Sequence, residues 1–149
     1  MNSKIKVVLV TGGFDPIHSG HIKYFESAKK LGSLLVVGLN SDEWLIRKKG
    51  KPFLPLFERI EIVKNLRMVD EVITWNDEDN SANGAIDSLL KKYPDANIIF
   101  ANGGDRKKTN IPELEKFKKH RNIKFVFGVG GENKKNSSSW ILKNWENYE

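Results

Sequence analysis

Gly12-Gly13-Phe14-Asp15-Pro16-Ile17-His18-Ser19-Gly20-His21 connects an apolar run at residues 5–10 to a helix-like pattern at residues 22–31. A glycine-bearing turn between a strand and a helix brings backbone N–H groups close to a phosphate, and the helix N-terminus points at it. The two histidines stand three residues apart and lie on one side of the first helical turn. Gly20 leaves the surface between them bare, so that a ligand can lie against the backbone. The segment predicts a site for a polyphosphate rather than for an apolar ligand.

Strand-like and helix-like segments alternate along the rest of the chain, which predicts a parallel α/β sheet. The predicted strands are Lys6–Val10, Leu34–Leu39, Glu71–Trp75, Asn97–Ala101 and Lys124–Phe127. The predicted helices are Ile22–Leu31, Asp42–Arg47, Leu56–Leu66, Ala85–Tyr93, Glu113–His120 and a last one that begins at Ser137 or Ser138. The polar, acidic segment 76–83 predicts a mobile loop. We expect a doubly wound parallel sheet of about five strands in one domain, residues 1–149, with a ligand crevice beyond the carboxyl ends of the strands.

Composition excludes several kinds of site. The chain contains no cysteine, which excludes disulfides, thiolate metal ligands and cysteine nucleophiles. It shows neither the hydrophobic segment of a signal peptide nor an apolar stretch long enough to span a bilayer, so we expect a cytoplasmic protein without a membrane partner. No cluster of metal-ligating side chains suggests a bound zinc ion, and we expect no metal held by the protein alone.

The positive charge of the chain is better explained by phosphate-bearing small substrates than by nucleic-acid binding. The net charge of +6 invites a nucleic-acid interpretation. However, the basic clusters at 47–51, 106–108, 118–121 and 134–135 lack the interleaved aromatic side chains of a stacking platform. Polyphosphate substrates need positive charge as well. We expect a phosphate role for cluster 47–51, which lies in the region of the predicted crevice, a solvated surface at 118–121, and no nucleic-acid partner.

Four segments resemble known motifs and stand in the family's order. The segment around His18 and His21 resembles the HxGH signature of the cytidylyltransferase-like nucleotidylyltransferases. Arg67–Val72 is similar to the RYVDEV segment of glycerol-3-phosphate cytidylyltransferases, Gly103-Gly104-Asp105 to the GGD of heptose-1-phosphate adenylyltransferases, and Ser137–Ser139 to the late ISTT or ISST motif. The resemblance covers most of the chain. It implies a Rossmann-like fold and transfer of a nucleoside monophosphate from an NTP to a phosphorylated acceptor, with release of pyrophosphate.

The resemblance also implies roles for the first segment. His18 and His21 contact the nucleotide phosphates and stabilise charge while the α-phosphorus is attacked. The residues expected to offer backbone contacts near the α-phosphate are Gly12, Gly13 and Phe14. Asp15 makes either a structural hydrogen bond or a contact to the ligand.

A lysine is expected across from the histidines. Lys48, Lys49 and Lys51 stand where similar enzymes place a lysine that neutralises the phosphates of both substrates. We expect Lys48 or Lys49 to take this role and the remaining lysines to be solvated. Arg59 matches an arginine in the ExR helix of the family that contacts nucleotide or phosphate; the alternative for it is a surface salt bridge.

The later motifs complete the predicted nucleotide site. Gly104 and the glycine before it let the backbone approach a base or ribose, and Asp105 accepts hydrogen bonds from hydroxyl or amino groups. Ser137, Ser138 and Ser139 supply hydroxyl groups and helix N-terminal amides for the outer phosphates, besides capping the helix. The family arginine upstream of these serines is absent, and Lys134 or Lys135 substitutes for it.

The identity of the substrates stays open at this point. Cytidylyltransferases typically carry a second acidic residue where this chain has Gly104-Asp105, which favours ATP slightly and leaves CTP as an alternative. The expected acceptor is a sugar phosphate or polyol phosphate. A Mg²⁺ ion held mainly by substrate phosphates is expected as cofactor, together with a homodimer through Arg67–Val72.

Two other functions remain as alternatives. One is a CTP-dependent enzyme of the glycerol-3-phosphate type. The other is a nucleotide-binding regulator without catalysis, against which the intact histidines and lysines argue. The absence of a GxGxxG after the first strand argues against a dehydrogenase.

Overall fold

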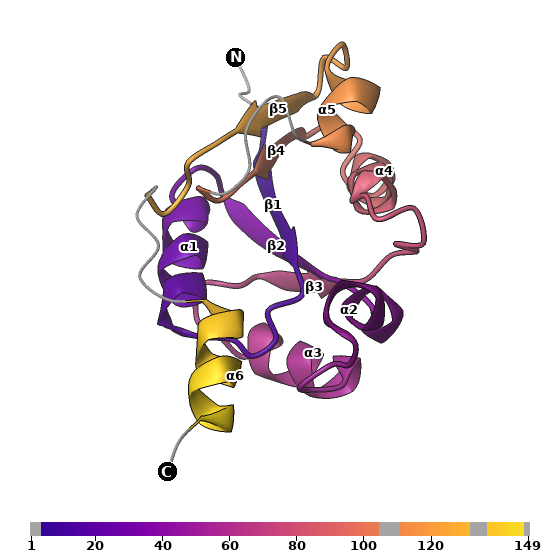
Figure 1. Cartoon of the computed structure of the whole chain (residues 1–149). Helices are drawn as coiled ribbons and strands as arrows, with labels where there is room; N and C mark the ends of the chain where they lie inside the picture. Colours follow the sequence, from indigo (N-terminus) through magenta and orange to yellow (C-terminus); the bar gives the residue numbers. More distant parts are fainter. Residues whose placement is uncertain (1–3, 105–110, 132–136, 148–149) are drawn as a thin grey trace.

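The computed structural model describes residues 4–104, 111–131 and 137–147, and it confirms the predicted doubly wound parallel α/β sheet (Figure 1). The strands are β1 (Lys6–Gly12), β2 (Leu34–Leu39), β3 (Glu71–Ile73), β4 (Asn97–Ala101) and β5 (Ile123–Val126). They are all parallel, in the order β3-β2-β1-β4-β5. The chain thus runs outward from β1 to β3 and then returns to the other side of β1 for β4 and β5. That reversal places a crevice at the carboxyl end of β1.

Helices cover both faces of the sheet (Figure 1). They are α1 (Ser19–Lys29), α2 (Asp42–Lys49), α3 (Leu56–Lys64), α4 (Asn83–Lys92), α5 (Pro112–Phe117) and α6 (Ser138–Glu146). Val7 and Leu9 of β1 belong to the core that packs under α4 and α5, while Val8 and Val10 belong to the core under α1 and α3. All four side chains are fully buried. Burial on both faces explains why this strand is a continuous apolar run.

Most element boundaries differ from the sequence prediction by one to three residues, and two of these differences shape the crevice. Helix α1 begins at Ser19 instead of Ile22 because the side chain of His18 caps it. Strand β3 ends at Ile73, which pairs with Gly38, so Trp75 lies beyond the sheet instead of within it. No helix among the described residues is long and apolar enough to cross a membrane.

Candidate active site

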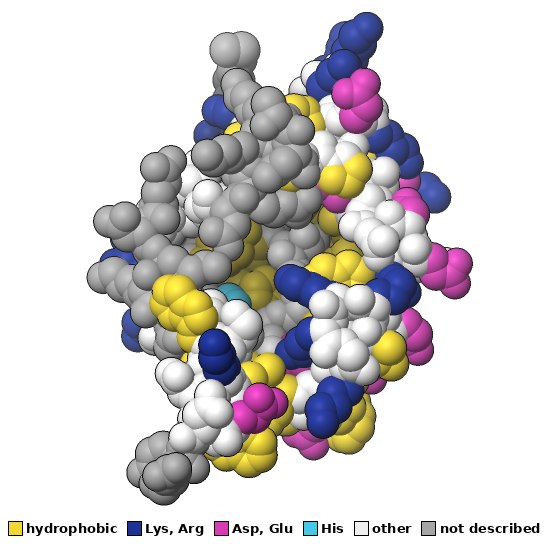
Figure 2. Space-filling view, in the orientation of Figure 1, with side chains coloured by type: hydrophobic (Ala, Val, Ile, Leu, Met, Phe, Trp, Pro, Cys, Tyr) yellow, Lys and Arg dark blue, Asp and Glu magenta, His cyan; other side chains and the backbone are white. Residues whose placement is uncertain are grey.

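A broad cleft lies at the carboxyl ends of the strands. Its volume of about 1660 Å³ exceeds the roughly 300–1,000 Å³ of most small-ligand sites, so it has room for two substrates. The predicted site residues that line it are Gly12, Gly13, Phe14, Asp15, His18, His21, Lys48, Lys49, Lys51, Gly104, Ser137, Ser138 and Ser139. Figure 2 shows this face hollowed near its centre, with a histidine at the hollow and Lys or Arg side chains along one edge.

The two histidines are fixed by the first turn of α1. His18 is the N-cap residue, and its Nδ1 accepts a hydrogen bond from the Gly20 amide at 3.0 Å. His21 Nδ1 accepts from the His18 amide at 3.2 Å, which completes a reciprocal capping box. The two rings stack with their centroids 3.8 Å apart. Because Nδ1 is the acceptor in both rings, each neutral imidazole carries its proton on Nε2.

His21 is held neutral by its surroundings. Burial, and then the charge of neighbouring His18, lower the pKa of His21 from its ordinary 6.5 to about 3. The ring of Phe14 meets it edge-on, with the ring centroids 4.9 Å apart. Phe14 itself adopts a left-handed backbone conformation with φ of 50°, which is uncommon for an aromatic residue. At neutral pH, His21 therefore acts as a neutral hydrogen-bond donor rather than as an acid in this state of the protein.

The lowered pKa predicts a pH-dependent stability. Between pH 6.5 and about 3, the unfolded chain binds a proton at His21 that the folded chain does not. The free energy of unfolding should therefore lose up to about 1.4 kcal/mol for each pH unit below 6.5, and it should not change through this group above 6.5. Urea denaturation between pH 7.5 and 4.5 measures it. The matched control is His21→Gln, which keeps a capping acceptor without titrating; parallel curves for the two proteins would contradict the prediction.

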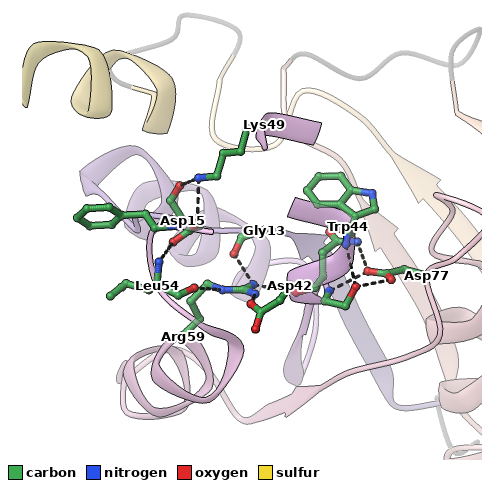
Figure 3. Close-up of polar contacts among 11 residues, drawn as sticks. Gly13, Asp15, Asp42, Trp44, Lys49, Leu54, Arg59 and Asp77 are labelled. Atoms are coloured by element: carbon green, nitrogen blue, oxygen red, sulfur yellow. Dashed lines mark hydrogen bonds and ion pairs between the residues drawn. The ribbon is translucent and has the colours of Figure 1, made fainter. Parts of the chain in front are cut away.

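Asp15 connects the glycine turn to the end of α2 and to the loop that follows this helix (Figure 3). Its carboxylate is almost fully buried and accepts from the amides of Phe53 at 2.6 Å and Leu54 at 2.7 Å. It also pairs with Lys49, whose Nζ lies 2.9 Å from Oδ2 and donates to the Asp15 carbonyl. Of the two roles left open for Asp15, the geometry supports the structural hydrogen bond. The Nζ of Lys48 lies 4.7 Å from the centroid of the Trp44 ring.

Arg59 does not reach the cleft with the other predicted residues. Arg59 lies on α3, and its side chain is fully buried. Its guanidinium donates to the carbonyls of Gly13, Asn40 and Leu54 at 2.8–3.0 Å. It also pairs with Asp42 at 2.8 Å (Figure 3). In the structure, Arg59 is a buried arginine, and it makes neither the expected phosphate contact nor the alternative surface salt bridge. It ties the ends of β1 and β2 together behind the glycine turn.

The serines lie at the N-terminus of α6. Ser137 caps the helix by accepting from the Trp140 amide at 3.1 Å, so the predicted capping role holds. Ser138 donates to the carbonyl of Pro16 at 2.8 Å, which brings this helix end beside the histidine segment. Asp105, Lys134 and Lys135 lie outside the described residues.

Sequence reasoning missed several residues of the cleft. Those that line it without having been predicted include Tyr24, Asn40, Trp44, Trp75, Ser81 and Glu113. Asn40 directly follows β2, and its position at a strand end was the available signal. The sequence pattern assigns Trp75 to a strand, and a large apolar side chain in a strand is usually part of the core. Among the described residues, no group of three or more His, Asp or Glu side chains could hold a metal ion.

Known proteins resemble this chain over most of its length. The sequence model of the cytidylyltransferase-like family matches residues 9–144. The bifunctional protein HldE of Nitratiruptor sp. is 37% identical over 126 residues, which cover 83% of this chain and 25% of that protein. HldE of Hydrogenovibrio crunogenus is 33% identical over 145 residues, 96% of this chain and 25% of that protein. This chain therefore spans about a quarter of the length of these relatives.

Solved structures show the same fold. The lipopolysaccharide core biosynthesis protein of Thermoplasma volcanium is 26% identical, with a TM-score of 0.65 over 83% of this chain and 95% of that one. The NadR protein in complex with NAD and AMP-PNP is 17% identical, with a TM-score of 0.61 over 98% of this chain and 45% of that one, a likeness of fold alone. The fold, the order of the motifs and the matched residues lead to one conclusion: this chain belongs to the cytidylyltransferase-like nucleotidyltransferase family.

Proposed function

We propose that this chain transfers a nucleoside monophosphate from an NTP, with ATP ahead of CTP, to a phosphorylated sugar or polyol. The observation that carries the proposal is the capping box of His18 and His21. It fixes two imidazoles at a helix N-terminus, in a cleft shared with the serine-bearing end of α6. Sequence similarity to HldE proteins and structural similarity to a lipopolysaccharide core biosynthesis protein support a sugar phosphate as the acceptor.

In the proposed reaction, an oxygen of the acceptor phosphate attacks the α-phosphorus of the NTP. A new P–O bond forms, the bond from the α-phosphorus to the bridging oxygen breaks, and the electron pair leaves with pyrophosphate. His21 donates its Nε2 proton in a hydrogen bond to phosphate oxygens, since its low pKa makes the neutral ring the resting form. Such reactions depend mainly on positioning and on electrostatic stabilisation.

Magnesium enters this proposal as part of the nucleotide substrate. Asp15, the acidic residue of the histidine segment, already accepts two backbone amides and pairs with Lys49. The side chains on this part of the cleft are therefore cations, hydroxyls and imidazoles, which suit phosphate better than a metal ion. Mg²⁺ usually keeps substrate phosphates and waters as ligands. A homodimer through residues 67–72 also stays a proposal.

The direct test measures pyrophosphate release. ATP and CTP are each combined with a panel of aldose 1-phosphates and with glycerol 3-phosphate. Release with ATP and an aldose phosphate supports the proposal. Release only with CTP and glycerol 3-phosphate supports the alternative of the glycerol-phosphate type, and nucleotide binding without release under any combination supports a regulator.

The two lysines at the end of α2 yield a further prediction. Converting Lys48 and Lys49 to alanine should raise the KM for a substrate, or lower turnover, by about tenfold or more, as losing a charge-assisted hydrogen bond does. The same change at Lys118 and Lys119, exposed cations outside the cleft, should do little. Steady-state kinetics of both double variants measures the difference. Equal effects would indicate general electrostatic attraction instead of a specific phosphate contact.

A further inference from the structure

One side of the cleft is formed by tryptophans and a loop, and we call it the indole wall. It consists of Trp44 on α2, Trp75 after β3, and residues 80–82 of the following loop, all of which line the cleft. Both indoles are partly exposed. Helices α1 and α6 stand on the other side, opposite α2 (Figure 1). The wall therefore faces the phosphate-binding groups across the cleft.

The indole of Trp75 is fixed in one orientation. Its Nε1 donates to the carbonyl of Ser81 at 2.8 Å. A Cβ atom on Gly38 would lie 2.9 Å from its six-membered ring, and one on Gly84 would lie 3.2 Å from Cδ1. The ring thus packs against the backbone of two glycines, where any side chain would displace it. Because its polar atom is bonded within the protein, the indole presents only apolar surface to a ligand.

The loop behind Trp75 is held as firmly as the ring. Asp77 is buried and accepts from the side chain of Asn40 at 3.0 Å and from the amide and hydroxyl of Ser41 at 2.8 and 2.7 Å (Figure 3). Although burial acts to raise the pKa of Asp77, these hydrogen bonds hold it below its usual value. Arg47 donates to the Asp77 carbonyl and to Asn80. The mobile loop predicted from the sequence is instead bonded into the end of β2 and into α2.

The far end of the loop is anchored to a different element. The amide of Ala82 donates to the carboxylate of Glu113 on α5 at 2.8 Å. The loop is thus attached to β2 and α2 at one end and to α5 at the other. Anchoring at both ends sets the wall in place before a ligand arrives, which lowers the entropic cost of binding.

The opposite part of the cleft suits the nucleotide. The end of α6 and the histidine segment meet there through Ser138 and Pro16, and both present phosphate-binding groups. Gly103 and Gly104 line the cleft beside them and let a flat base approach the backbone. A nucleotide with its phosphates between α1 and α6 leaves the indole wall to the second substrate.

We propose that the indole wall is the acceptor subsite and that the Trp75 ring stacks on the C–H face of a cyclic sugar phosphate. The inference rests on the proposed function. A rigid apolar face of this kind fits the face of a pyranose or furanose ring, whereas glycerol phosphate has no ring to stack. The ammonium of Lys48, over the Trp44 ring at the rim, stands beside the wall to meet the acceptor phosphate. The wall thus selects cyclic sugar phosphates over acyclic polyol phosphates.

Two variants of Trp75 test the subsite. Trp75→Leu keeps an apolar side chain on Gly38 and Gly84, whereas Trp75→Phe keeps an aromatic face. We expect Trp75→Leu to raise the KM for an aldose 1-phosphate by about tenfold, the effect of losing an aromatic contact, and to change the KM for the NTP by less than about twofold. Trp75→Phe should stay near the wild type. The control is Phe57→Ala, an aromatic residue that is 69% exposed outside the cleft.

Binding measurements separate this inference from the proposed reaction. Isothermal titration of an aldose 1-phosphate into wild type and variants requires no turnover, so it tests the wall even if no pyrophosphate is released. Affinity that falls in Trp75→Leu and persists in Trp75→Phe supports the subsite. A raised KM for the NTP at an unchanged acceptor KM would instead place the nucleotide base on Trp75. Equal binding by both variants, or a preference for glycerol 3-phosphate, would also overturn the inference.

Discussion

Replacing His21 with alanine should lower kcat by about 100-fold or more, the cost of losing a hydrogen-bond donor aimed at developing charge. The neutral imidazole carries its proton on Nε2 because Nδ1 accepts from the His18 amide. The Nε2–H donor is therefore oriented before the substrate binds. A water molecule that replaces the imidazole in the variant would first have to be ordered, so it would stabilise the developing charge less well. The fold should persist, since the change removes the capping bond to the His18 amide, worth about 1 kcal/mol, and the ring contacts with His18 and Phe14, but no residue of the two hydrophobic cores.

Pyrophosphate release under saturating NTP measures this effect, with a thermal melt of the same protein. His120→Ala is the matched control, because His120 is exposed and lies outside the residues that line the cleft. It should keep the turnover of the wild type. Near-normal turnover by His21→Ala would remove His21 from the catalytic residues.

Replacing Arg59 with methionine should lower the free energy of unfolding by about 3 kcal/mol, the cost of breaking a buried charged network. The guanidinium is fully buried, and three backbone carbonyls lose their donor with it. Its partner Asp42 is 34% exposed, so solvent weakens that ion pair, and the expected loss lies at the lower end of the range for buried pairs. Turnover should fall as well, because the Arg59 bond to Gly13 fixes the peptide that carries the Phe14 amide.

Urea denaturation of Arg59→Met measures the loss of stability, and Arg121→Met is its control. Arg121 is exposed and lies outside both the residues that line the cleft and the segment proposed for the dimer, so the change should be below about 0.5 kcal/mol. If Arg59→Met kept the stability of the wild type but bound the NTP more weakly, this would contradict the structural role and support the phosphate contact predicted from the sequence.

Much of the fold could be predicted because its signals are local. The apolar run of β1 marks that strand through neighbouring residues alone. The parallel order then follows from alternation and right-handed crossovers. The sequence pattern places the start of α1 three residues too late because His18 is an unusual cap, whereas it brings the start of α6 to Ser137 or Ser138 because serine is a common one.

The residues of the candidate site also differ in whether local sequence determines their position. His18, His21 and the serines could be predicted because their neighbours in sequence determine their place at a helix N-terminus. Arg59 could not be placed, because its partners are carbonyls of three separate segments, and a sequence pattern does not show whether a cation will be buried.

By itself, the sequence determined the elements, the sheet and the position of the segment that we propose binds phosphate, since those depend on apolar periodicity, glycine and capping over a few residues. Only the tertiary structure decided the low pKa of His21, the burial of Arg59 and the indole wall. Burial and hydrogen bonding between distant segments create these properties: Trp75 becomes a wall of the cleft because β3 stops at Ile73 and because Gly38 and Gly84 leave space for its ring. Such contacts arise only when the packed chain brings β2, the loop after β3 and α4 together.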